Sequence, residues 1–312
     1  MRRSAAIQPE AGPWLGAGGI LLAAAVAMID ARLDQSWANG VHLIVAALAF
    51  ALVFGLALLS PLPERPLAYQ STLALSGLVL LAITLDRLAH VFGVDSPFGN
   101  TGTLMWMSAV FALVAAFAAL RFRSRGCALL AGLAVAGFVL AFVDRVFNPS
   151  GVDTFRWILF LLVLGFAAAA LRARRGPEPG FAVQAVDVAG LLLIALGGTF
   201  AVGLVLASIS PLAAPAVSTA DAGLGWRLIL VAGSLAVLGY AAATRERGPG
   251  WIGFFALVVA ILVVSNPAGE RTIVGWPLVL LLAAGAAFAL GLAPRPDRGR
   301  AAPAPPTAPP GP

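Results

Sequence analysis

The sequence predicts an all-α polytopic membrane protein with about ten transmembrane helices, arranged as five antiparallel hairpins with both termini in the cytoplasm. Of its 312 residues, 60% are hydrophobic and 11% are charged, whereas a soluble domain carries about 25% charged residues. The apolar residues form runs long enough to cross a bilayer, which takes about 20 residues. Most of the Arg residues lie in alternate gaps between these runs.

Ten apolar segments are the expected membrane helices. Each is apolar around its whole circumference, as a helix surrounded by lipid is, and Pro, Asp, Glu and Arg are concentrated in the gaps. The ninth segment is short for a span. The segments lie approximately at 13–29, 40–60, 70–92, 103–120, 127–143, 156–171, 188–209, 225–243, 250–265 and 274–293.

Three regions follow from these segments. Residues 1–12 form a short cytoplasmic segment, 13–293 form the transmembrane domain, and 294–312 form a Pro- and Ala-rich cytoplasmic tail. We expect the tail to be disordered, because it has too little apolar surface to bury. The start of the chain also resembles a signal peptide, with Ala25-Val26-Ala27 as a cleavage motif. Ten residues separate Arg3 from the apolar run, so we expect the first helix to be retained, with cleavage as the alternative.

The distribution of Arg predicts the orientation. All 20 basic residues are Arg; with the N-terminus inside, 14 lie in cytoplasmic segments and 6 in outer loops, which agrees with the positive-inside rule. The clusters "RFRSR" and "RARR" are also expected to attract anionic inner-leaflet lipids. Heavy use of Ala, Gly and Arg indicates a GC-rich genome, so we expect a bacterial plasma (inner) membrane. The cytoplasmic set is Arg2, Arg3, Arg65, Arg121, Arg123, Arg125, Arg172, Arg174, Arg175, Arg245, Arg247, Arg295, Arg298 and Arg300.

The predicted outer turns resemble one another. Each leads to a Trp near the start of the next helix, a position typical of interfacial anchors. The closest internal match pairs "NPSG" (148–151) with "NPAG" (266–269), and "RSRG" (123–126) with "RERG" (245–248). Either a unit is duplicated, or short turns have converged on Asn, Pro and Gly. If both turns are tight, Gly151 and Gly269 are expected to share special dihedrals, including positive φ.

A polar cluster at the predicted outer end is one candidate site. It consists of His42, Asp86, His90 and Asp144, and it includes both histidines of the chain. Asp86 and His90 share a helix face if the third helix continues through them. An Asp–His pair can bind a metal or act as acid and base. The alternative, which we expect, is a pair that only anchors the helix.

A second candidate is a break of the seventh helix at Gly197, Gly198 and Thr199, where exposed backbone can form a binding site. Close packing of small residues is the alternative that we expect. No motif assigns a catalytic residue, a metal site or a cofactor, and the single Cys127 excludes a disulfide framework. We also expect no nucleic-acid partner, because no basic patch is interleaved with aromatics on a soluble module.

Three functions remain open. We expect a non-enzymatic membrane component or accessory protein, whose partners are the lipid bilayer, anionic lipids and an unidentified protein. A small-molecule or lipid transporter is the alternative, and a membrane-embedded enzyme at the outer face is the third. A midplane cavity with a broken seventh helix would indicate transport. Convergence of the four cluster residues would indicate an enzyme, and a solid bundle packed through Ala would indicate the accessory role.

The orientation is testable by cysteine labelling of intact cells. In a variant without Cys127, a Cys at Ser124 is expected to react with a membrane-impermeant reagent only after permeabilisation, because residues 121–126 form a cytoplasmic loop. A Cys at Ser218, in a predicted outer loop, is the control and should react without permeabilisation. Labelling of position 124 from outside would reverse the orientation.

Overall fold

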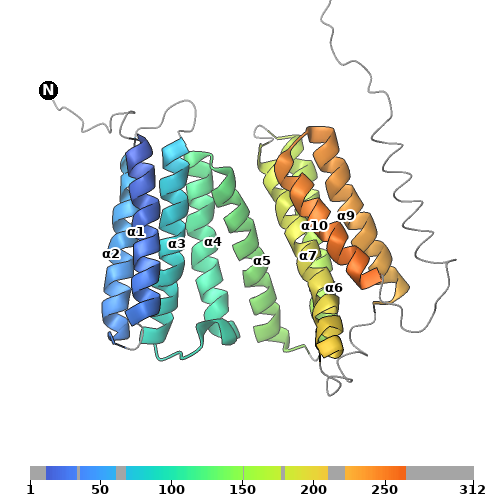
Figure 1. Cartoon of the computed structure of the whole chain (residues 1–312), viewed down its shortest axis with the longest axis horizontal. Helices are drawn as coiled ribbons and strands as arrows, with labels where there is room; N and C mark the ends of the chain where they lie inside the picture. The colour runs from blue at the N-terminus through green and yellow to red at the C-terminus, as the bar shows by residue number, and fades with distance from the viewer. Residues whose placement is uncertain are drawn as a thin grey trace, which may run out of the picture. The chain divides into compact units, whose positions relative to one another are not determined.

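The computed structural model of the chain describes residues 12–33, 36–60, 68–149, 151–176, 180–209 and 222–264, with the backbone alone over 202–209. Within these residues the structure has nine helices long and apolar enough to cross a membrane, and it has no strand (Figure 1). The predicted all-α class is confirmed to this extent, and the chain is a multi-pass membrane protein. The tenth predicted segment, 274–293, lies outside the described residues.

Nine of the predicted segments correspond to these helices. In the labels of Figure 1 they are α1 (Gly12–Leu33), α2 (Asn39–Leu59), α3 (Ala68–Val91), α4 (Thr101–Phe122), α5 (Arg125–Phe147), α6 (Val152–Arg174), α7 (Gly180–Ile209), α9 (Leu224–Thr244) and α10 (Arg247–Val264), with a 3-10 turn η2 (Pro97–Gly99) before α4.

Each of the nine helices begins earlier than predicted, and the two largest differences, at α7 and α6, extend a helix through charged residues. α7 begins at Gly180 rather than at 188, so Asp187 lies two turns inside it. α6 begins at Val152 rather than at 156, so Arg156 lies in its second turn and not in an outer loop. The predicted boundaries followed the apolar runs. A membrane helix, however, continues into the interface with polar residues in its first turns.

Successive helices run in opposite directions, so their described ends lie at two levels (Figure 1). The Arg-rich end holds the starts of α1, α3, α5, α7 and α10 and the ends of α2, α4, α6 and α9; the Trp-rich end holds their other ends. Extensive packing joins α4 to α5, α6 to α7 and α2 to α3, and the two helices of each pair follow one another across the Arg-rich end. The grouping into five hairpins across the Trp-rich end stays a prediction.

A tight turn explains why α4 and α5 pack so closely. Arg123 ends α4 in the left-handed conformation (φ 49°), and the Ser124 side chain then accepts a hydrogen bond from the Cys127 N–H at the start of α5. Arg245 ends α9 in the same conformation (φ 60°). Few non-Gly residues adopt it, so "RSRG" and "RERG" share a turn as well as a sequence. Gly151 has the predicted positive φ (112°), and Gly269 lies outside the described residues.

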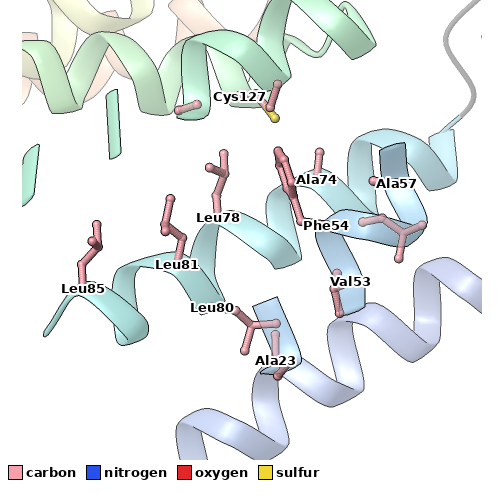
Figure 2. Packing of buried hydrophobic residues seen from close by; sticks show 14 of the residues in the cluster. Ala23, Val53, Phe54, Ala57, Ala74, Leu78, Leu80, Leu81, Leu85 and Cys127 are labelled. Carbon is pink, nitrogen blue, oxygen red and sulfur yellow. The ribbon is translucent and has the colours of Figure 1, made fainter. Parts of the chain in front are cut away.

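The interior is built from small side chains, and many large apolar side chains face outward. Ala46, Ala57, Ala74 and Ala115 are at most 1% exposed, whereas Leu113 is 72% exposed. Lipid is as apolar as Leu, so buried small residues, which let backbones approach, stabilise such a bundle. Helix α3 lies at the centre of one cluster. Figure 2 shows Leu78, Leu81 and Leu85 on the face of α3 that points toward the helix carrying Cys127, with Leu80 beside Ala23.

Helix α7 is the centre of the packing farther along the chain. A Cβ atom added to Gly190 would lie 2.5 Å from Ile252 Cγ2, and one added to Gly197 would lie 2.5 Å from Val259 Cγ1. The two glycines and the two α10 residues are each seven positions apart, so α10 follows one face of α7 over two turns. Gly198, by contrast, has open space around it.

The adjacent residues Gly197 and Gly198 give a matched test of the packing of α10 against α7. Gly197→Ala is expected to destabilise the protein by about 1–3 kcal/mol, because the new methyl group overlaps Val259, whose β-branched side chain has one preferred rotamer in a helix. Gly198→Ala is expected to be neutral or to stabilise by about 0.5–1 kcal/mol. Thermal unfolding in detergent measures both, and equal midpoints would contradict the close approach of α10 to α7.

Candidate functional site

The structure places Asp86 and His90 together near the Trp-rich end of α3. The helix continues through both residues to Val91. His90 Nδ1 lies 2.9 Å from the Asp86 backbone oxygen and 3.6 Å from Asp86 Oδ2. Both side chains are about one-fifth exposed. Their predicted common face is therefore present, and the contacts are of the kind that fixes the end of a helix.

His42 takes part in a different group, which joins three helices. The Asp30 carboxylate on α1 accepts two hydrogen bonds from Arg87 on α3, from Nε at 2.6 Å and from Nη2 at 2.9 Å. His42 Nδ1 on α2 lies 3.2 Å from Asp30 Oδ1, and His42 Nε2 lies 3.2 Å from the Leu33 backbone oxygen. His42 and Arg87 are buried. The bidentate contact between Arg87 and Asp30 therefore joins α3 to α1.

Asp144, the fourth residue of the candidate cluster, belongs to neither group. It is half-buried near the end of α5, where its backbone oxygen accepts a hydrogen bond from the Asn148 N–H. Among the described residues, no three His, Cys, Asp or Glu side chains gather closely enough to hold a metal ion. Among the described residues, Asp86 thus contacts His90 and His42 contacts Asp30, and no three of the four cluster residues come together.

Residues Gly197, Gly198 and Thr199 lie within the continuous helix α7, so the backbone carries no break there. Thr199 is instead the partner of Arg156. Arg156 Nε lies 3.2 Å from Thr199 Oγ1, and Nη2 lies 3.4 Å from the Thr199 backbone oxygen. The guanidinium also donates to Asp153 Oδ1 at 2.7 Å and stacks 3.7 Å from the centre of the Phe200 ring. Sequence reasoning missed this contact because it placed Arg156 in a loop.

An apolar groove lies between α6, α7 and α9. Its volume is about 490 Å³, within the range of about 300–1,000 Å³ that is usual for ligand sites. Its walls include Val163 and Ala167 from α6, Ala189 and Leu193 from α7, and Ala236 from α9. All three helices are long and apolar enough to span a membrane. The groove is therefore surrounded by residues at hydrocarbon depth.

The two ends of the groove differ chemically. At the Trp-rich end, Phe160 and Trp157 pack around Trp226, with ring centres 6.1 and 4.8 Å from it. At the Arg-rich end the groove is lined by Arg174 and Tyr240, and the Arg174 guanidinium lies 5.4 Å from the Tyr240 ring centre. From Phe160 to Arg174 is 14 residues, about 21 Å of helix. The groove is thus long and apolar, with a cation at one end.

The comparisons add no relative to this picture. No protein family model, no curated protein and no solved structure matches the chain.

The Asp30–Arg87 pair yields a stability prediction. Arg87→Met is expected to destabilise the protein by about 3–5 kcal/mol, because it leaves the Asp30 carboxylate without its main donor among packed helices. Arg32→Met, at an exposed position on α1, is the control and is expected to change stability by less than about 0.5 kcal/mol. Unfolding in detergent measures both. A similar small effect of the two substitutions would show that the pair does not stabilise the fold.

Proposed function

We propose that the protein is a non-enzymatic membrane component that binds a lipid, with one acyl chain in the groove between α6, α7 and α9. The observation that carries the proposal is this groove, which is apolar along its length and basic at one end. The proposal places the protein in the bacterial plasma membrane with the Arg-rich end in the cytoplasm, as the Arg distribution predicts.

An acyl chain fits the groove by polarity and by length. The groove extends about 21 Å along α6, whereas one leaflet contributes about 15 Å, half of a hydrocarbon core of about 30 Å. A single acyl chain that enters from the Arg-rich end therefore fits within the groove. Apart from Arg174 and Tyr240 at one end, the side chains that line the groove cannot hydrogen-bond, so desolvation of a water-soluble metabolite would oppose its binding.

The cation at the Arg-rich end favours an anionic headgroup. Arg174 lines the groove, and Arg172 and Arg175 adjoin it in the sequence. An Arg guanidinium binds phosphate oxygens through paired hydrogen bonds. Basic pockets between membrane helices on the cytoplasmic side are known to take anionic lipid headgroups. We therefore propose that the bound lipid is an inner-leaflet phospholipid with net negative charge.

A lipid transporter is the second candidate, and the same groove favours it. Transport also requires a second arrangement of the helices. The continuous α7 and the Arg156–Thr199 contact support a fixed wall for the groove, and for this reason we place the binding component first. An enzyme at the outer face is the third candidate, and among the described residues no three of His42, Asp86, His90 and Asp144 come together to form its site.

Filling the groove tests the proposal. Ala236→Trp projects an indole into the groove from α9, so it is expected to displace the lipid. Native mass spectrometry of the full chain released from phosphatidylglycerol-containing nanodiscs measures the retained lipid, with an expected loss of at least about tenfold, or about 1.4 kcal/mol. Ala169→Trp is the matched control, because Ala169 is exposed on α6 and lies outside the groove.

A substitution of Arg174 tests the proposed binding of the lipid headgroup. Arg174→Gln is expected to reduce the preference for phosphatidylglycerol over phosphatidylcholine while some lipid remains bound. Retention of the same lipid by wild type, Ala236→Trp and Ala169→Trp would contradict the proposal. The absence of lipid from all three proteins would also contradict the proposal. It would indicate another occupant of the groove, either the chain's own segment 274–293 or a partner.

A further inference from the structure

Asp187 is a buried acid whose surroundings do not satisfy it. It lies seven residues into α7, about 10 Å along the helix axis, and is 5% exposed. Its Oδ1 atom is fully buried and has no hydrogen-bond partner among the described residues. A charged carboxylate without a donor, at membrane depth, costs several kcal/mol. The site must therefore supply something that the described side chains do not.

The space around Asp187 is shaped by α10. Asp187 lies on the face of α7 that carries Gly190 and Gly197, which is the face covered by α10. A Cβ atom added to Gly248 would lie 3.1 Å from Asp187 Oδ2. The missing side chain at Gly248 thus leaves room for the carboxyl group and for nothing much larger.

The charged and titratable groups around Asp187 come from three other helices, α5, α6 and α9, and from the connection between α9 and α10. Glu246, in the connection between α9 and α10, is close enough for its negative charge to act on Asp187. Arg125, at the start of α5, lies 3.4 Å from Glu246 and is its ion-pair partner. Tyr240 on α9 is within electrostatic reach of Asp187 and of Arg174 on α6. Arg125 is therefore paired with Glu246, and Arg174 lies 5.4 Å from the centre of the Tyr240 ring.

We propose that Asp187 is a proton-binding site, reached from the Arg-rich end, and that its ligand is a proton rather than a metal ion. Burial favours the neutral acid, and the second carboxylate nearby favours it further. A metal ion would need more oxygen or nitrogen ligands than this acid and Glu246 supply. A proton needs one oxygen, and the Asp187 Oδ1 atom offers one.

Infrared spectroscopy of the full chain in lipid nanodiscs tests this site. Between about pH 5 and about pH 9, a range above the ordinary titration of Asp and Glu, wild type is expected to show the carbonyl signal of a protonated carboxyl group that disappears as the pH rises. Asp187→Asn is expected to abolish the signal. Asp95→Asn, at an exposed position before η2, is the control and should leave it unchanged.

A second variant keeps the test decisive if Asp187→Asn fails to fold. Glu246→Gln removes the neighbouring negative charge and frees Arg125, so the signal should persist with its midpoint at lower pH. An unchanged midpoint in Glu246→Gln, or a signal that survives Asp187→Asn, would overturn the assignment. Wild type without the signal, but stabilised against heat by sodium chloride relative to choline chloride, would assign a cation instead and also overturn it.

Discussion

The close approach of α10 to α7 is the constraint on which both proposed sites depend. Helices in lipid gain little from the hydrophobic effect when they pack together, so their association depends on how closely their backbones approach. Gly190 and Gly197 give α7 a smooth face against Ile252 and Val259. That contact fixes the rotation of α7 about its axis. It thereby turns Asp187 toward Gly248, while Ala189 and Leu193 on another face line the groove.

Buried arginines near the helix ends determine the relative rotation and depth of the helices, which small apolar residues do not. Arg87 binds Asp30 in a bidentate geometry, and Arg156 contacts both the hydroxyl and the backbone oxygen of Thr199. Such contacts require one rotation and one depth of each helix. A buried ion pair contributes little net stability over an apolar contact, whereas breaking it is costly. The two arginines therefore select one arrangement among many that apolar helices would tolerate.

The positions of the helices could be predicted from the sequence, but which helices pack against each other could not. A run of about 20 apolar residues identifies a span, but a helix that is apolar all round gives no signal for which face meets which partner. The spacing of Asp86 and His90 correctly predicted their contact within one helix. The partnership of His42 with Asp30 depends on the rotation of two helices, and the groove depends on gaps that three helices leave together. Asp187 was assigned to a loop because it interrupts the apolar pattern.

The two proposed sites lie on different faces of α7, and Tyr240 is near both. It lines the groove beside Arg174, and it lies within electrostatic reach of Asp187. An anionic headgroup at Arg174 adds negative charge on one side of Tyr240, and that charge favours a neutral acid on the other side. Linkage then requires that a proton on Asp187 increases the affinity for the lipid by the same factor. A lipid-binding component with this property would hold its lipid more tightly as the pH falls at the Arg-rich end.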